Sequence, residues 1–195
     1  MENKLDRRVQ KTKRSLRSAY IDLIEQYRES EITVSMIAQY SDLNRATFYA
    51  HYSNKGEFLE ETLYDLLDGL RKAILSPFEN IDTINVNTLA PTTVKIFEYI
   101  EKNKRLFYAM YISHPEFKKR LEELFYQIFS EDIFMEVKST IGVVHYEIFL
   151  YYQTNATLGL IFNWIQGEFE YSAKFMMEQL TIFSNTQVIG LKKNK

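Results

Sequence analysis

The sequence predicts an all-helical protein, on three observations. Apolar residues recur at helical steps of three, four and seven, strand-like alternation does not occur, and there are only three prolines and six glycines. The chain has 195 residues, enough for one large or two small domains with a buried core. Hydrophobic residues make up 46% and charged residues 26%, which is typical of a globular protein.

The first half of the sequence predicts four helices. The first covers residues 6–28, where apolar residues fall on one helical face. Thr33 is a good N-cap for a short second helix, which Asp42 ends. A third, equally short helix is expected over residues 44–49 and a long one over residues 55–75.

The second half predicts further helices separated by turn signals. After a loop over residues 76–90, Pro91 is expected in the first turn of the next helix. Residues 113–116, Ser-His-Pro-Glu, have the form of a capping box. A long helix is predicted over residues 143–166, and Gly167 should end it.

Positive charge gathers at the N-terminal end. Residues 1–17 hold seven basic residues against two acidic ones, and residues 1–58 carry a net charge of +2 against −4 for the remainder. A basic end on an acidic body favours an anionic polymer that contacts this end only. A solubilising tail would explain the same charges.

Two short helices joined by a tight turn, after a longer helix, describe a helix-turn-helix. Ala38 is small enough to let the two helices cross closely. Asp42 stands where the turn often needs a left-handed backbone, which Asp tolerates better than most residues. Leu43 and Phe48 are expected to point inward, so the opposite face of the second short helix is left for DNA.

Each residue on that outer face has a plausible task in a DNA major groove. Arg45 can pair with a guanine edge, worth about 1–3 kcal/mol of discrimination, and Asn44 can read adenine or hold a phosphate. Ala46 allows close approach or contact with a thymine methyl group. Groups suited to phosphates, which set register rather than sequence, are Thr33, Ser35, Thr47, Tyr49, His51 and Lys55.

The stretch over residues 33–59 resembles the DNA-binding domain of the TetR family. The family signature, T-x-Y-x-H-aromatic-x-x-K-x-x-L, is matched in order by Thr47, Tyr49, His51, Tyr52, Lys55 and Phe58-Leu59. The resemblance covers about residues 7–60, with Asp42 in place of the more usual glycine. It implies a dimeric bacterial transcription regulator of about nine helices that acts on double-stranded operator DNA in the cytoplasm.

This resemblance also divides the chain. Residues 1–54 would form the helix-turn-helix domain, and residues 55–195 an all-helical body for dimerisation and effector binding. Residues 157–165 resemble a helix of a subgroup that includes regulators of dihydroxyacetone kinase operons. A stripe with small residues is the predicted dimer interface, although packing within one protomer would also explain it; its members are Tyr152, Ala156, Gly159, Leu160 and Asn163.

The body is rich in aromatic residues, and these predict a pocket for a small apolar or aromatic effector. The candidate lining residues are Phe97, Phe107, Tyr108, Tyr111, Phe125, Tyr146 and Phe149. Most aromatic residues at helical spacing are core residues, so each of these can instead be packing. An effector would favour one of two arrangements of the body and change the distance between the two DNA-reading helices.

Enzyme chemistry finds no support in the sequence. No phosphate-binding loop, serine nucleophile elbow or pair of histidines one helical turn apart occurs, and cysteine is missing. We therefore expect no catalytic residue, metal or cofactor, and no membrane span. The function predicted is a ligand-responsive, DNA-binding repressor that acts as a homodimer; the alternative is an adaptor or coactivator that works through protein contacts.

Overall fold

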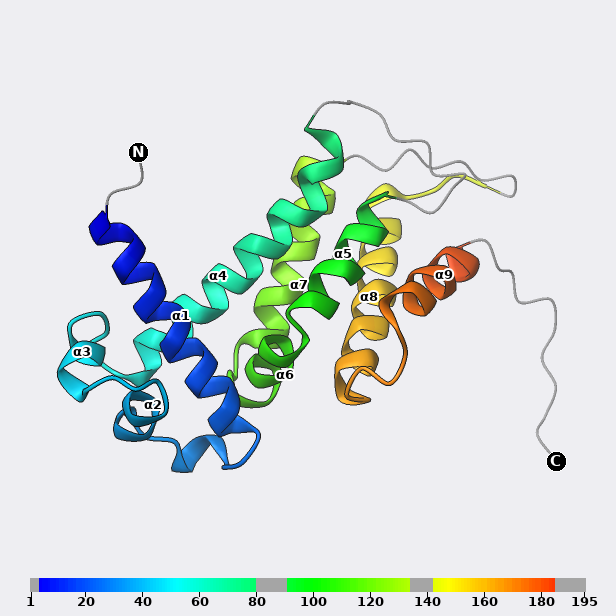
Figure 1. The fold of residues 1–195 in the computed structure, drawn as a ribbon. Coiled ribbons are helices and arrows are strands. Elements are labelled where there is room, and N and C mark those ends of the chain that lie inside the picture. Colours follow the sequence, from blue (N-terminus) through cyan, green and yellow to red (C-terminus); the bar gives the residue numbers. More distant parts are fainter. Residues whose placement is uncertain (1–3, 80–90, 134–141, 185–195) are drawn as a thin grey trace, which may run out of the picture. The chain divides into compact units, whose positions relative to one another are not determined.

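The computed structural model describes residues 4–79, 91–133 and 142–184, and within these ranges it is all-helical (Figure 1). Nine α-helices are present there, and no strand, which confirms the predicted fold class. The helices are α1 (Lys4–Ile24), α2 (Val34–Tyr40), α3 (Arg45–Tyr49), α4 (Lys55–Leu75), α5 (Pro91–Lys102), α6 (Lys104–Ser113), α7 (Phe117–Gln127), α8 (Tyr146–Gln166) and α9 (Ala173–Ser184). Three short elements join them: the 3-10 helices η1 (Glu29–Glu31) and η2 (Ser76–Phe78), and the π-helical turn η3 (Ile128–Asp132).

The helices form two compact units. The first contains the described parts of residues 1–68 together with residues 105–123, and the second the described parts of residues 69–104 and 124–195. Helices α4 and α7 therefore each contribute to both units. The predicted functional boundary between residues 54 and 55 stays a prediction.

The first unit packs around α1. Leu16, Tyr20 and Leu23 recur at steps of four and three on one face of α1, and all three are fully buried. Ile37 and Ala38 of α2 are buried as well. The small side chain of Ala38 is therefore in the core between helices, as the sequence predicts.

The second unit is built around α8. Trp164 is buried, and its ring centroid lies 5.4 Å from that of Phe97 on α5. The Glu101 carboxylate of α5 accepts a hydrogen bond of 3.0 Å from the backbone N–H of Ala173, the first residue of α9. Ser172 caps the same helix by accepting from the N–H of Phe175. Helices α5 and α9 are thus joined by a polar contact at the beginning of α9.

A close approach between α4 and α5 depends on a glycine. A Cβ atom added at Gly69 would lie 2.1 Å from the hydroxyl oxygen of Tyr99. Glycine is thus the residue that fits at this position without movement of the Tyr99 side chain.

Several predicted boundaries are corrected. Helix α1 ends at Ile24 rather than at residue 28, and α8 begins at Tyr146 rather than at residue 143. The capping box predicted over residues 113–116 is wrong, because Ser113 is the last residue of α6 and its hydroxyl donates to the backbone oxygen of Ala109. Most of the predicted loop over residues 76–90 lies outside the described residues.

The connection between α8 and α9 is a tight turn. Gly167 caps α8, as predicted, but it is Glu168 and Phe169 that adopt left-handed backbone angles, with φ of 51° and 60°. The indole N–H of Trp164 donates to the backbone oxygen of Tyr171, and the Phe169 ring packs edge-on against Trp164.

Among the described helices, none combines the length and apolar character needed to cross a membrane.

Candidate nucleic-acid interface

Helices α2 and α3 form the predicted helix-turn-helix. Thr33 caps α2 by accepting a hydrogen bond of 3.3 Å from the N–H of Met36. In the turn, Asp42 has a left-handed φ of 55°, and the N–H of Leu43 donates to the backbone oxygen of Ala38. The predicted N-cap and the predicted left-handed turn residue are both confirmed.

Helix α3 is short, and its N-terminus is capped by its own sequence. Asn44 Oδ1 accepts from the backbone N–H of Thr47 at 2.7 Å and from its hydroxyl at 2.9 Å. Phe48 is fully buried, whereas Arg45 and Ala46 are exposed. A side chain that caps its own helix has fewer acceptor sites left for a base, so Asn44 is better suited to positioning α3 than to reading adenine.

The exposed aromatic ring of α3 is Tyr49. The Arg45 guanidinium carbon lies 5.7 Å from the Tyr49 ring centroid, which is within the range of a cation–π contact. Arg45 and Tyr49 are one helical turn apart, so the contact lies along the outer face of α3. This outer face therefore carries a cation, a phenol hydroxyl and the small Ala46.

An aromatic cluster holds α3 in place. The rings of Phe48, Tyr52 and Phe58 lie 5.3–5.8 Å from one another, and Tyr20 of α1 contacts Phe58 edge-on. All four rings are buried. Tyr52 is thus a core residue, while His51 is half-buried beside it.

Glu61 of α4 contacts this cluster through Tyr52 and also binds two cations. Its carboxylate accepts hydrogen bonds from Lys13 (2.7 Å), Arg17 (3.2 Å) and the Tyr52 hydroxyl (2.8 Å). Burial raises the pKa of Glu61, but these hydrogen bonds and the two cations outweigh burial and lower the pKa below its usual value. Burial and the contact with Glu61 raise the pKa of Tyr52. Sequence analysis did not identify Glu61, because its partners lie up to 48 residues away.

Lys55 is the first residue of α4, as expected, but its ammonium group points into the protein. Nζ donates to the backbone oxygens of Glu29 (3.0 Å) and Ile32 (2.9 Å) and lies 2.8 Å from the Glu29 carboxylate. Of the other predicted phosphate contacts, Thr33, Ser35 and Tyr49 are exposed, and Thr47 and His51 are half-buried. Their contacts with DNA stay predictions.

The predicted effector residues are divided between the two units. Phe107, Tyr108 and Tyr111 belong to the first unit, while Phe97, Phe125, Tyr146 and Phe149 belong to the second. Three of them are fully buried against other rings: Phe97 against Trp164, Phe107 against Phe117 and Phe125 against Phe129. These three rings thus serve as core packing. Their predicted role in effector binding stays a prediction.

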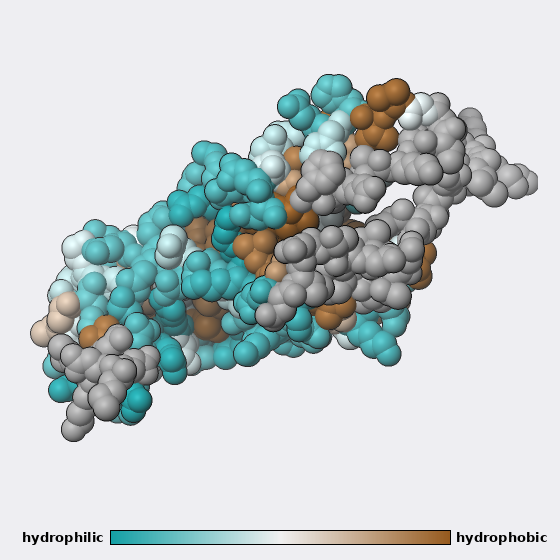
Figure 2. All heavy atoms as spheres, turned by 90° about the horizontal axis from the view of Figure 1, so that it is seen from above, coloured by the Kyte–Doolittle hydropathy of each residue, from teal (hydrophilic) through white to brown (hydrophobic). Residues whose placement is uncertain are grey.

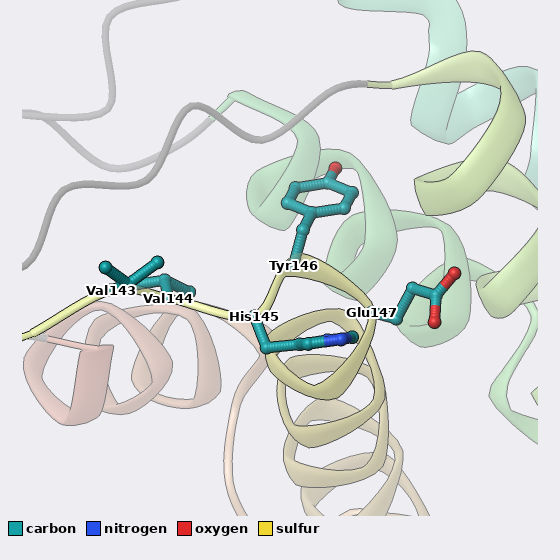
Figure 3. A pocket seen from close by; sticks show the side chains of 5 residues that line it. All are labelled: Val143, Val144, His145, Tyr146 and Glu147. Carbon is teal, nitrogen blue, oxygen red and sulfur yellow. The ribbon is translucent and has the colours of Figure 1, made fainter.

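A surface depression of about 550 Å³ lies at the beginning of α8 (Figure 3). It is lined by five consecutive residues, 143–147, of which only Tyr146 was predicted to contact an effector. Figure 3 shows the side chains of Tyr146 and Glu147 pointing in different directions, not toward one point. The depression therefore offers no convergent set of polar groups to a ligand.

The predicted dimer stripe lies on the accessible side of α8. Tyr152 is 67% exposed, Ala156, Gly159 and Asn163 are also exposed, and Leu160 is half-buried. A Cβ atom added at Gly159 would have no neighbour within 4 Å, so this glycine is not required by packing within the described part of the protomer. The face drawn in Figure 2 is mainly hydrophilic, and hydrophobic residues reach it in separate patches.

Fold and site together define a helix-turn-helix protein with a helical body. Residues 87–186 match the TetR-type family described as transcriptional regulator C-terminal region. Because this match covers just over half of the sequence, the chain belongs to the TetR family of transcriptional regulators. The resemblance found at the N-terminal end and the match at the C-terminal end thus agree on one family.

Individual relatives support the same class. The HTH-type transcriptional regulator YxbF of Bacillus subtilis, described as uncharacterized, is 21% identical over 154 residues, which cover 78% of this chain and 39% of that protein. The chain thus spans about two fifths of the length of this curated relative. The relatives and similar structures are described as regulators or operon activators, not as enzymes.

Three solved structures share the fold. A TetR transcriptional regulator from Streptococcus agalactiae 2603V has a TM-score of 0.61 at 20% identity, over 91% of this chain and 96% of that one. The dihydroxyacetone kinase operon activator DhaS has a TM-score of 0.59 at 16% identity, over 88% of this chain and 93% of that one. The TetR family regulator PfmR from Thermus thermophilus has a TM-score of 0.56 at 18% identity, over 91% of this chain and 99% of that one.

Proposed function

We propose that this regulator binds DNA in a sequence-specific manner as a homodimer and represses transcription until a small effector releases it. The observation that carries DNA binding is the form of α3. Its inner side is anchored by the buried Phe48, while its outer side presents Arg45, Ala46 and Tyr49 to solvent. A helix held in this way can enter a major groove without rearranging its own core.

The contacts divide into two kinds. Arg45 reads a base edge, because a guanidinium can bond to both acceptors of guanine at once. Hydroxyl groups at Thr33, Ser35 and Thr47 and the phenol of Tyr49 contact phosphates and set the position of α3. Asn44 contributes by capping α3.

Dimerisation is supported by the accessible stripe on α8. An operator read symmetrically requires two α3 helices about 34–36 Å apart, which one protomer does not supply. Exposed Tyr152 together with the small residues Ala156 and Gly159 provides a surface against which a second helix can pack closely. On α9, Phe175 and Ile182 are also exposed and extend the apolar surface available to a partner.

Effector response is supported by the course of α4. This helix belongs to both compact units, so a change in the second unit that tilts α4 also moves the segment that begins at Lys55. An effector that binds one of two arrangements more tightly would shift their populations and change the spacing of the α3 helices. An apolar or aromatic molecule is the chemistry that the aromatic residues of the body favour.

DNA binding is tested by selecting duplexes from a random-sequence pool and comparing Arg45→Ala with the wild type. We expect the wild type to enrich a symmetric sequence and the variant to lose preference at one base pair of each half-site, at a cost of about 1–3 kcal/mol. Lys119→Ala, which removes an exposed cation from α7, is the matched control and should keep the preference. Failure to enrich any sequence would contradict the proposal and favour an adaptor that works through protein contacts.

Dimerisation is tested by placing a charge in the stripe. Gly159→Arg should shift the protein from dimer to monomer in sedimentation velocity, because an arginine has no partner in a close helix contact. Glu123→Arg introduces the same residue at an exposed position on α7 and should leave the dimer intact. Equal behaviour of the two variants would exclude this face of α8 as the interface.

A further inference from the structure

The ammonium group of Lys55 is bound by oxygens of the protein itself. A lysine ammonium carries three N–H donors. In the structure three oxygens surround Nζ: the backbone oxygens of Glu29 and Ile32, at 3.0 and 2.9 Å, and a carboxylate oxygen of Glu29 at 2.8 Å. The first two contacts are hydrogen bonds and the third is an ion pair, so the protein itself engages the ammonium group.

The three acceptors lie directly before α2. Glu29 is in η1, and Ile32 is the buried residue that precedes Thr33, the N-cap of α2. Lys55 therefore ties the first residue of α4 to the segment that leads into α2. The start of α4 is held separately, since Asn54 Oδ1 accepts from the N–H of Glu57 at 2.9 Å.

The charge around Lys55 also opposes a contact with phosphate. The Glu29 carboxylate lies against Nζ, so the pair presents little net positive charge to an approaching phosphate. To bind that phosphate, Lys55 would have to leave two backbone oxygens without their donor and bring a carboxylate close to a second anion. Both changes oppose the contact.

We infer that Lys55 is a positioning residue, which holds the start of α2 and its N-cap Thr33 in place for DNA and does not itself contact phosphate. This inference rests on the proposed DNA binding and refines it. It replaces the phosphate contact expected for Lys55 from the sequence alone. The positive charge that drives DNA association must then come from other cations, such as exposed Lys11 and Arg14 on α1.

The test combines two measurements on Lys55→Met, which removes the ammonium group and keeps most of the aliphatic chain. The first is the slope of log K against log salt for the duplex enriched by the wild type, where each phosphate contact contributes about 0.9. The second is amide hydrogen exchange of Met36 and Ile37 in the DNA-free protein. Lys174→Met, at an exposed position of α9, is the control for loss of one positive charge.

We expect the salt slope of Lys55→Met to equal that of Lys174→Met, with weaker binding at every salt concentration. In the DNA-free protein, exchange at Met36 and Ile37 should be roughly tenfold faster than in the wild type, since the charged anchor of the preceding segment is gone. Lys55→Arg keeps a cation beside Glu29 and should restore part of the protection. If Lys55 only contacted a DNA phosphate, its replacement would not change exchange in the absence of DNA.

Two results would overturn the inference: a slope smaller by about 0.9 in Lys55→Met, or exchange at Met36 and Ile37 that is unchanged. Should Lys55→Met not fold, Glu29→Gln decides, because weakening the ion pair must also speed exchange at these two amides. A wild-type protein without affinity for any duplex would defeat the proposed DNA binding. The exchange data would still show whether Lys55 holds the start of α2.

Discussion

The hydroxyl of Tyr52 donates a hydrogen bond of 2.8 Å to the carboxylate of Glu61, which also accepts from Lys13 and Arg17. Tyr52 lies three residues after the end of α3, whereas Lys13 and Arg17 belong to α1. One carboxylate on α4 thus joins the first helix to the chain leaving α3. Interactions that converge on one group in this way are expected to be coupled rather than additive.

This relationship predicts how acid acts on the protein. The pKa of Glu61 is lower in the folded state than its usual value, so its contribution to stability is present above the unfolded pKa of about 4.3 and is lost as pH falls through the folded pKa. Glu61→Gln should therefore lower the free energy of unfolding at neutral pH and make its decline in acid less steep. Urea unfolding at a series of pH values measures both effects, with Glu123→Gln as the exposed control.

Alkaline conditions should act through Tyr20, which with Tyr52 is one of two buried tyrosines whose pKa the fold raises. Burial raises the pKa of Tyr20 from 10.0 to about 12, so the folded state favours the protonated hydroxyl. The associated stability is present below the unfolded pKa and is lost as pH rises from 10 toward 12. Tyr20→Phe keeps the ring and removes the ionisable group, so its unfolding free energy should fall less steeply over this interval. A decline equal to that of the wild type would mean that another group governs alkaline unfolding.

The turn between α2 and α3 offers a stabilising substitution. Asp42 has a φ of 55°, a conformation that glycine adopts without a steric penalty. Asp42→Gly should raise the free energy of unfolding by up to about 1 kcal/mol and leave DNA selectivity unchanged. Ser41→Gly, at a φ of −89°, lacks this strain to relieve and should destabilise. Thermal unfolding of the two variants measures both effects. Equal changes in stability would contradict the explanation.

Gly69 should tolerate no larger residue. In Gly69→Ala the new methyl group would meet the Tyr99 hydroxyl at 2.1 Å, so the Tyr99 ring or one of the two helices must shift, at a cost of about 1–3 kcal/mol. In a Tyr99→Ala background the same change should be neutral or stabilising, because alanine is the better helix former. A double-mutant cycle in denaturant isolates this coupling. Additive effects would show that the two residues do not constrain each other.

Much of the fold follows from local sequence. Thr33 was recognisable as an N-cap and Asp42 as the left-handed residue of the turn, because each depends on the chain within three or four residues. The N-cap role of Asn44 is equally local but was not predicted. Local signals failed where two of them compete. Ser113 resembles an N-cap, yet its hydroxyl bonds backward to Ala109 and ends α6.

The site was predictable only in part, for the same physical reason. The exposure of Arg45 follows from its charge, and helical periodicity places Ala46 opposite the buried Phe48. The state of Lys55 does not follow from periodicity, because its acceptors lie up to 26 residues earlier. The aromatic residues proposed for one effector pocket fall into two different compact units, a division that spacing along the chain does not encode.

The amino-acid sequence alone thus determined the helical class, the helix-turn-helix and the outer face of α3, since caps, turns and periodicity act over a few residues. Tertiary structure decided which charges remain available. Lys13, Arg17 and Lys55 are held by carboxylates brought to them from other helices, and only folding creates those pairs. A cation's role depends on the partner it meets in space, whereas its position in a motif depends on its neighbours in the chain.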